Sequence, residues 1–490
     1  QGGTSAGTSV GLDNGSLAFI TSDGDNQLIE FTGTGSTINA TGGSVGSNNN
    51  AGIVARNGSQ TIRGSIAAHA PNIVLTGGND GVPGESNGAQ LGAFNGAQNI
   101  SAQNATLNAG SGLESFALIA SPTQTLQFSG NVVLDGATAT GLDGGVRIGG
   151  RGGASGSNTN LNMSVGGNLT LSAGTFNGAG IGVTSAATGL TNDIVLTVGG
   201  TLTMAPSANA GTRIGSRAVD VQAGNIQVTA ANILMSAGGG GNNIAGIRTL
   251  GNVTLAATAG DIVEAADSNI RANTLTASAV TGLNLDSQNN LITNLSATNT
   301  TSGNITVANN PANLLTVTGM GQFAGGTIII GADDLDITGP VSAPGGAVTL
   351  RPLTLSRAVH VESANSGSVL SLSPADLAQI TTGVLQLGRL DGSGDLSILS
   401  SMANTSVNAA TLLMVSGNDI TLGGGASIGL VGTEFNHSLE LRAANNLQLT
   451  SGNIFLADNR NLKAYADNDG STVGSVNIGA GTFKVGAGAG

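Results

Sequence analysis

Short apolar bursts with alternating polar residues run along the whole chain. Phrases such as "NIVLTGG", "NLTLSAG" and "NILMSAG" place apolar side chains at every second position, as Leu169 and Leu171 do, and small residues follow each burst. This period of two predicts short β-strands with one buried face. The Gly, Asn, Asp and Ser between the bursts are the residues that close tight corners. The pattern therefore predicts an all-β chain.

One phrase returns at a fixed interval. The hexapeptides "GVRIGG", "GAGIGV", "GTRIGS" and "IAGIRT" place Ile148, Ile181, Ile214 and Ile247 at intervals of 33 residues. Three strands with their corners fill such an interval, and one turn of this kind, a rung, buries its inward face only by stacking on its neighbours. We therefore predict a right-handed parallel β-solenoid (β-helix) with three short strands per rung.

The spacing of the phrases divides the chain into two parts. Residues 1–250 carry the wider rungs of about 33 residues, and in residues 251–490 the openings of successive rungs lie closer together. A helical insertion is expected near 373–383, where "SPADLAQITTG" offers a capping serine, a proline in the first turn and a closing glycine. The domain prediction is thus a long-rung solenoid followed by a shorter-rung solenoid.

Composition narrows the possible partners. The chain has 15 Lys and Arg against 28 Asp and Glu, a net charge of −13, and its arginines form no cluster in the sequence. Nucleic acids and anionic membrane surfaces select basic stripes, so neither is an expected partner. No apolar run reaches the roughly 18 residues of a membrane helix, which argues against membrane insertion. The absence of cysteine is compatible with an oxidising, extracellular space.

Three segments resemble a known family. They are "GNVTLAATAGDIVEAADSNIRANTLTASAVTGLNL", "GGTIIIGADDLDITGPVSAPGGAVTL" and "RPLTLSRAVHVES" with "LSLSPADLAQITTGVLQLG", and they are similar to repeats of filamentous-haemagglutinin-like exoproteins. The resemblance implies a β-helix adhesin of Gram-negative bacteria, exported by two-partner secretion or as an autotransporter passenger. The family's secretion domain with Asn-Pro-Asn phrases and its membrane barrel are not found, so we expect a processed product or a piece of a longer chain.

Polysaccharide-cleaving enzymes also use β-helices, and they need carboxylates that converge as general acid and base. The best candidates are Asp334 and Asp336, which alternation places on one face, with Asp333 on the other. A neighbouring rung could add Arg357 or His360. The sequence favours acidic residues at a strand edge and corner over a catalytic group, so no catalytic residue is predicted.

Metal and cofactor motifs are incomplete. His69, His360 and His437 are isolated and lack ligand spacing. The "DNDG" of 467–470 lacks the glutamate of a calcium loop, and "GGNDGVPGES" at 77–86 lacks the calcium-binding nonapeptide. The glycine-rich "GGRGGASGSN" at 149–158 has no Lys-Ser/Thr and no following helix for a phosphate. We therefore predict no metal and no cofactor.

Two further sets of residues recur within the repeat. Gln60, Gln98 and Gln124 could stack as a hydrogen-bonded ladder or could simply suit an outward strand position, and the sequence favours neither. Three aromatic residues are expected to pack in the core or to plug corners: Phe94, Phe116 and Phe128.

The function expected from these patterns is an extracellular structural or adhesive rod on the surface of a Gram-negative bacterium, serving adhesion, aggregation or a biofilm matrix. Its partners would be a host or bacterial surface, through glycan or protein, or other copies of itself, together with an outer-membrane secretion partner. A self-assembling homopolymeric fibre subunit is one alternative. A β-helix polysaccharide-cleaving enzyme is the other, and the chain is not expected to be an enzyme.

Overall fold

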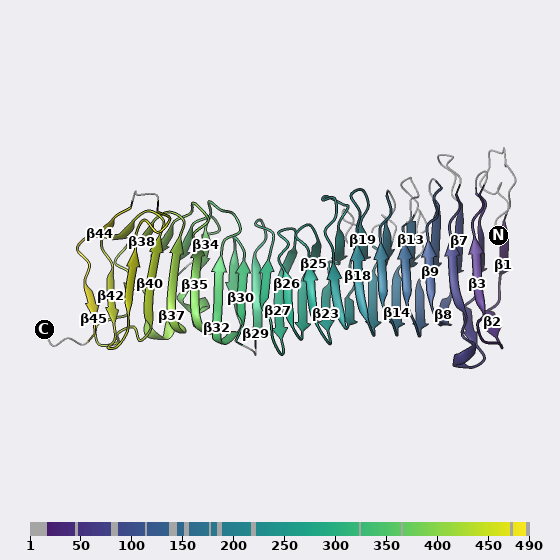
Figure 1. Ribbon diagram of the computed structural model, residues 1–490, viewed down its shortest axis with the longest axis horizontal. Helices are drawn as coiled ribbons and strands as arrows, with labels where there is room; N and C mark the ends of the chain where they lie inside the picture. The colour runs from purple at the N-terminus through teal and green to yellow at the C-terminus, as the bar shows by residue number, and fades with distance from the viewer. Residues whose placement is uncertain are drawn as a thin grey trace. The chain divides into compact units, whose positions relative to one another are not determined.

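The computed structural model describes residues 17–44, 48–79, 87–112, 115–136, 145–150, 156–175, 178–183, 189–216, 222–322, 325–363, 366–470 and 474–486. They belong to two compact units, Gln1–Asn273 and Thr274–Gly490. Strands dominate both units, and every strand pair with a defined register is parallel, which makes the fold the expected all-β parallel solenoid (Figure 1).

The first unit stacks three strands per rung, so its strands form three faces. The first face consists of β1 (Ala18–Ser22), β4 (Ala51–Ala55), β7 (Gly88–Ala93), β10 (Phe116–Ala120), β13 (Gly145–Gly149), β16 (Ala179–Ile181), β19 (Thr212–Gly215) and β22 (Ala245–Arg248). The second face consists of β2 (Gln27–Phe31), β5 (Gln60–Gly64), β8 (Ala97–Ala102), β11 (Thr123–Phe128), β14 (Thr159–Val165), β17 (Asn192–Val198), β20 (Ile226–Ala230) and β23 (Asn252–Ala257). The third face consists of β3 (Thr37–Thr41), β6 (Asn72–Thr76), β9 (Ala105–Asn108), β12 (Val132–Asp135), β15 (Leu169–Ser172), β18 (Thr201–Ala205), β21 (Asn232–Met235) and β24 (Asp261–Glu264).

The recurring isoleucines stack directly on one another in the first face. Ile148 pairs with Ile181, Ile181 with Ile214, and Ile214 with Ile247. All four side chains are fully buried. Residues that are one repeat interval apart thus occupy the same inward position on successive rungs, and their stacking builds a continuous apolar core.

A ladder of glutamines lies inside the second face. Nε2 of Gln60 donates to Oε1 of Gln27 at 2.7 Å, Gln98 donates to Gln60 at 2.7 Å, and Gln124 donates to Gln98 at 2.8 Å. Gln60 and Gln98 are fully buried. Of the two alternatives that the sequence leaves open, the stacked amide ladder is therefore confirmed. Each amide satisfies its neighbour, which makes the buried position tolerable.

Asparagines form a second ladder at the corner between the second and third faces. Oδ1 of Asn104 accepts the backbone N–H of Asn131, Asn131 accepts from Asn168 in the same way, and Asn168 accepts from Thr201, at 2.8–2.9 Å. Gly199 is required at this corner because a Cβ there would come within 2.4 Å of the Gly166 carbonyl oxygen. Side chains at the corners therefore tie each rung to the next.

The phenylalanines of the repeat occupy different environments. Phe128 is buried among the apolar residues of the second face. The Phe116 ring instead covers Gly88 on the preceding rung, where a Cβ would clash with it at 2.1 Å. Phe94 lies against Gly92 in the turn that follows β7.

A 3-10 helix, η1 (Ala67–His69), follows β5.

The second unit uses longer strands that bend through corners. Its first row contains β26 (Gly282–Leu285), β28 (Ile305–Ala308), β30 (Thr327–Gly331), β32 (Val341–Arg351), β35 (Ile380–Arg389), β37 (Asn408–Ser416), β40 (Ser438–Ala443) and β43 (Leu462–Tyr465). Beside it run β25 (Asn269–Ala279), which begins in the first unit, β27 (Leu291–Asn299), β29 (Leu315–Gln322) and β31 (Leu335–Ile337). Two smaller sheets contain β33 (Val359–Val361), β34 (Leu370–Leu372), β36 (Leu396–Ile398), β38 (Ile420–Leu422), β41 (Leu447–Leu449) and β44 (Val476–Ile478), and β39 (Ser427–Ile428), β42 (Asn453–Leu456) and β45 (Phe483–Val485).

Rung length differs along the chain. In the first unit, hydrogen bonds between stacked glutamines join residues 33, 38 and 26 positions apart. In the second unit, the bond from Thr327 to Asn304 spans 23 positions, and the bond from Arg389 to Pro352 spans 37. The long interval contains β33, β34 and the one α-helix among the described residues.

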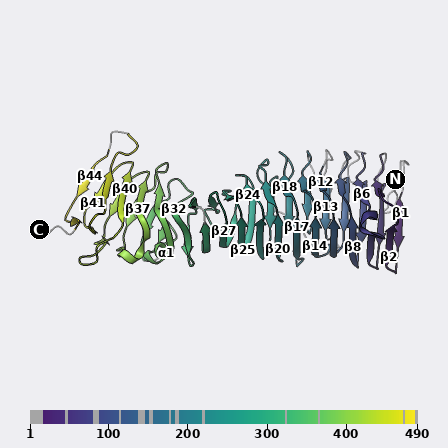
Figure 2. The same ribbon diagram turned by 60° about the horizontal axis from the view of Figure 1, so that its bottom comes forward.

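This helix, α1 (Pro374–Ala378), lies beside the strands of the second unit (Figure 2). Oγ of Ser373 accepts from the Asp376 N–H at 3.1 Å, and the Asp376 carboxylate accepts from the Ser373 N–H at 2.7 Å. This capping box satisfies two N–H groups that a helix start leaves unpaired. The helix is shorter than the stretch 373–383 suggests, because β35 begins at Ile380 and takes Gly383 into the sheet. A second 3-10 helix, η2 (Asn404–Ser406), precedes β37.

Candidate functional site

The three aspartates before and within β31 (Leu335–Ile337) differ in burial. Asp333 is 3% exposed, whereas Asp334 and Asp336 are partly exposed, as the alternation predicts. The Asp333 carboxylate accepts the N–H groups of Leu353 at 2.8 Å and Thr354 at 2.9 Å, and also the Thr354 hydroxyl. Asp333 therefore holds the corner of the next rung.

The two basic candidates contact groups other than the Asp336 carboxylate. Arg357 Nη2 donates to three backbone carbonyls, those of Asp333 at 3.0 Å, Gly367 at 2.7 Å and Val369 at 3.2 Å. Its guanidinium thus ties a loop to the acidic segment. His360 Nδ1 lies 3.5 Å from Oε2 of Glu362.

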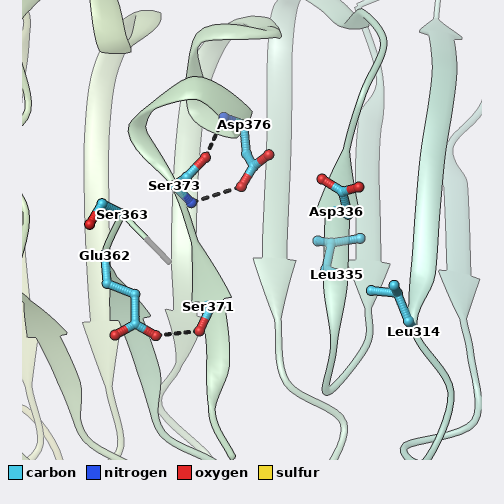
Figure 3. Close-up of a pocket in the computed structure, with 8 residues that line it drawn as sticks. All are labelled: Leu314, Leu335, Asp336, Glu362, Ser363, Ser371, Ser373 and Asp376. Atoms are coloured by element: carbon cyan, nitrogen blue, oxygen red, sulfur yellow. Dashed lines mark hydrogen bonds between the residues drawn. The ribbon is translucent and has the colours of Figure 1, made fainter. Parts of the chain in front are cut away.

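A hollow of about 350 Å³ lies next to Asp336 (Figure 3). Carboxylates and hydroxyls line most of it, and Leu314 and Leu335 supply an apolar part. Neither Arg357 nor His360 lines it. The lining residues are Leu314, Leu335, Asp336, Glu362, Ser363, Ser371, Ser373 and Asp376.

Two of the three carboxylates in the hollow are engaged in local structure. Figure 3 shows Asp376 bonded to Ser373 in the capping box, and Oδ1 of Asp376 also accepts the Ile337 N–H at 3.4 Å. Glu362 accepts the Ser371 hydroxyl in the same view. These contacts position the start of α1 and strand β34, so both carboxylates have a structural role.

Asp336 supplies the third carboxylate of the hollow. Burial raises the pKa of the Asp336 carboxyl above its usual value, and the negative charges of Asp376 and Asp334 raise it further. A carboxyl with a raised pKa can donate a proton, which is the property a general acid needs. The hollow therefore offers one proton donor, and its other two acidic groups are occupied by neighbouring hydroxyl and amide groups.

Sequence reasoning did not single out Glu362 for this hollow. The outward orientation of Glu362 could have been read from "VHVES", because Val359 and Val361 face inward and the alternation turns His360 and Glu362 outward. Which neighbour the outward carboxylate meets depends on the fold of the segment up to α1, and local periodicity does not encode that.

The remaining histidines have structural partners. His69 Nδ1 lies 2.8 Å from the Ser65 hydroxyl. The His437 ring contacts the carbonyls of Ala409 and Asn404, and it packs edge-on against Phe435 with ring centroids 4.8 Å apart. Within the described residues, no group of three or more acidic, histidine or cysteine side chains could hold a metal ion.

The other motifs weighed in the sequence lie partly outside the described residues. Of the stretch 77–86, residues 80–86 lie outside them, and of 149–158, residues 151–155 do. The "DNDG" stretch is a turn in which Asp467 has a φ of 55° and its carbonyl accepts from Gly470 at 3.1 Å.

The chain was compared with protein families, curated proteins and solved structures. No family model, curated protein or solved structure matches the chain. In the part of the chain that the structure describes, no helix is both long and apolar enough to cross a membrane.

Proposed function

We propose that the chain is an extracellular structural or adhesive solenoid of a Gram-negative bacterial surface, which mediates adhesion, aggregation or the cohesion of a biofilm matrix. It would reach the surface through an outer-membrane secretion partner, as the resemblance of its repeats implies. The observation that carries the proposal is the use of polar side chains for stacking. The glutamine ladder inside the second face and the asparagine ladder at the corner connect rung to rung, and this investment in stacking supports a structural role.

Such a solenoid acts through its geometry. Stacked rungs present the same outward position repeatedly, about 4.8 Å apart along each face, and this spacing suits contacts with extended partners. The outward side chains of the strands can vary while the inward positions and the corner asparagines hold the rungs together.

Adhesion can be tested with beads that carry the purified chain. Coated beads are expected to bind bacterial or host cell surfaces, or to aggregate with one another, more strongly than albumin-coated beads. Equal behaviour of the two bead types on every surface tested, without aggregation, would contradict the proposal.

A fibre subunit is the second candidate because core positions are uncovered on β44. Ile478 is 62% exposed although its register partner Leu449 is buried, and Val476 is 47% exposed although its partner Leu447 is buried. A strand of a second copy could cover these positions by β-augmentation. Electron microscopy across a dilution series should then show filaments that Ile478→Lys abolishes, whereas single particles at every concentration would exclude the fibre.

A polysaccharide-cleaving enzyme is the third candidate, and the raised pKa of Asp336 beside the hollow is the observation in its favour. Depolymerisation of acidic and neutral polysaccharides is measured through new reducing ends, with Asp336→Asn as the matched variant. Activity that Asp336→Asn removes would establish the enzyme. An absence of activity, or activity that the substitution leaves intact, would eliminate Asp336 as its acid.

A further inference from the structure

The first unit brings together four arginines that are scattered in the sequence. On the first face, Arg147 pairs with Gly180, Gly180 with Arg213, and Arg213 with Gly246, so two arginines recur on alternate rungs of one outward column. Both arginine side chains are partly exposed. Gly180 leaves room for Arg213, because a Cβ at this glycine would come within 3.1 Å of the Arg213 Nε.

The next column of the same face holds two arginines in direct register. Arg248 at the end of β22 pairs with Arg271 in β25. Arg248 is only 5% exposed, and its Nε donates to Oδ1 of Asn269 at 2.8 Å. Its guanidinium lies over Gly246, where a Cβ would approach the Arg248 Cζ to 2.7 Å. The glycine thus makes space for a recessed cation.

Two guanidinium groups in register on neighbouring strands repel each other. Burial lowers the pKa of Arg248 to about 10, and the positive charge of Arg271 contributes to the decrease. Even so, Arg248 carries its charge at neutral pH. A buried guanidinium in register with a second, partly exposed one is an arrangement that an anion would stabilise.

The strands of this face that carry the four arginines add no negative charge. The described residues of β13, β16, β19 and β22 and the first three residues of β25 include no Asp or Glu. The chain as a whole has a net charge of −13. Among the described residues, the charged side chains that these strands contribute to the face are therefore all positive, and the arginines follow the stacking direction.

We infer that this arginine row, formed by Arg147, Arg213, Arg248 and Arg271, binds a linear polysaccharide that carries carboxylates, with the chain running along the stacked rungs. The pair formed by the recessed Arg248 and the partly exposed Arg271 holds one carboxylate, and Arg213 and Arg147 contact further carboxylates of the same polysaccharide chain. This inference rests on the proposed adhesive function and names the chemical class of its ligand.

The spacing and chemistry of the row favour this ligand. Guanidinium groups match carboxylates in a two-point, fork-like geometry. Arg147 and Arg213 lie two rungs apart, roughly 9.6 Å at the usual interstrand distance, which is on the scale of two sugar units. Duplex DNA carries one charge per about 1.7 Å and would need a denser basic surface.

The test measures binding of the full chain to sodium polygalacturonate, with neutral dextran and dextran sulfate as comparison polymers. The variants are Arg248→Gln, Arg271→Gln and their combination. Arg213→Gln, at a partly exposed position, keeps the test available if substitution of the buried Arg248 prevents folding. Arg63→Gln is the control, because Arg63 pairs with Glu30 at 2.9 Å on the second face. Circular dichroism and thermal unfolding check that each variant is folded.

The unsubstituted chain and Arg63→Gln should bind polygalacturonate and not dextran, more weakly as salt rises. Loss of charge-assisted hydrogen bonds should weaken binding by roughly tenfold to a hundredfold in the combined variant and by less in Arg213→Gln. The inference is overturned if polygalacturonate binds no better than dextran, if dextran sulfate alone binds, or if the folded arginine variants bind as the unsubstituted chain does.

The bead assay separates this inference from the proposed function. Beads of the combined variant that still adhere while polygalacturonate binding is lost would support the site and place the adhesive contact on another face. Polygalacturonate binding by a chain whose beads neither adhere nor aggregate would support the site and contradict the adhesive function.

Discussion

The glutamine ladder makes a sharp prediction about stability. In the substitution Gln98→Leu, a side chain of similar volume replaces a fully buried amide that donates to Gln60 and accepts from Gln124. Two hydrogen bonds are lost, and the Oε1 of Gln60 is left without its donor. Gln124 keeps a second bond, from Nε2 to the Ile119 carbonyl at 3.2 Å.

The matched control is Gln124→Leu at the end of the ladder. The Oε1 of Gln124 has no partner because the next rung places Leu161 at this position. Gln124→Leu also removes two hydrogen bonds, but it ends the ladder one rung earlier and leaves a single buried acceptor unpaired, as before. The two variants therefore differ by one orphaned buried amide oxygen.

The magnitudes follow from this difference. Each lost hydrogen bond costs about 1 kcal/mol, an orphaned buried polar group costs roughly 1–3 kcal/mol, and burying leucine in place of glutamine offsets about 1–2 kcal/mol. We expect Gln98→Leu to lower the free energy of unfolding by about 2 kcal/mol, and Gln124→Leu to change it by less than about 1 kcal/mol. Urea unfolding followed by circular dichroism measures both, provided that the m-values are equal. Equal destabilisation by the two variants would refute the role of the ladder.

Three further predictions concern the hollow and the corners. Ser373→Ala should destabilise the protein by about 1 kcal/mol through loss of the helix cap, measured as a lower urea midpoint, and an unchanged midpoint would show that α1 does not depend on the cap. Asp336→Asn should raise the free energy of unfolding at neutral pH, because the raised folded-state pKa of Asp336 means that its ionisation costs stability. The gain should vanish as the pH falls below the unfolded-state pKa of Asp. A gain that does not depend on pH would contradict this cause. Gly199→Ala should lower the free energy of unfolding by at least about 1–3 kcal/mol, because its Cβ meets the Gly166 carbonyl oxygen. The control is Gly240→Ala, where the Cβ has open space but φ is 78°, so this variant reports backbone strain alone. Equal thermal midpoints for the two variants would argue against the clash.

The strand pattern and the stacking interval were predictable from the sequence because both are periodic. Alternation places Leu169 and Leu171 inward, and the phrase interval brings Ile181 onto Ile214. The orientation of the glutamines was also within reach, since Gln60 stands two residues before the buried Ile62 and so shares its face.

Contacts between rungs of unequal length were not predictable in the same way. Arg147 and Arg213 each precede one of the recurring isoleucines, so the 33-residue interval already places them in one column. Arg248 and Arg271 are 23 positions apart, and the fixed interval does not bring this pair together. Likewise, the hollow beside Asp336 depends on where α1 and β34 return to the sheet. Register across corners determines these neighbours, and local periodicity does not report it.

The central claim is that residues far apart in the sequence occupy the same position on successive rungs, and distances between spin labels test it most directly. The chain has no cysteine, so Val74→Cys and Leu234→Cys introduce unique label sites within the first unit. Register links them through Thr106, Val133, Thr170 and Thr203, which is five rungs or about 24 Å at the usual interstrand spacing. A narrow distribution near this value, within the reach of the label linkers, is the predicted result. A broad distribution, or a mean far from this value, would contradict the stacked register on which the proposed function rests.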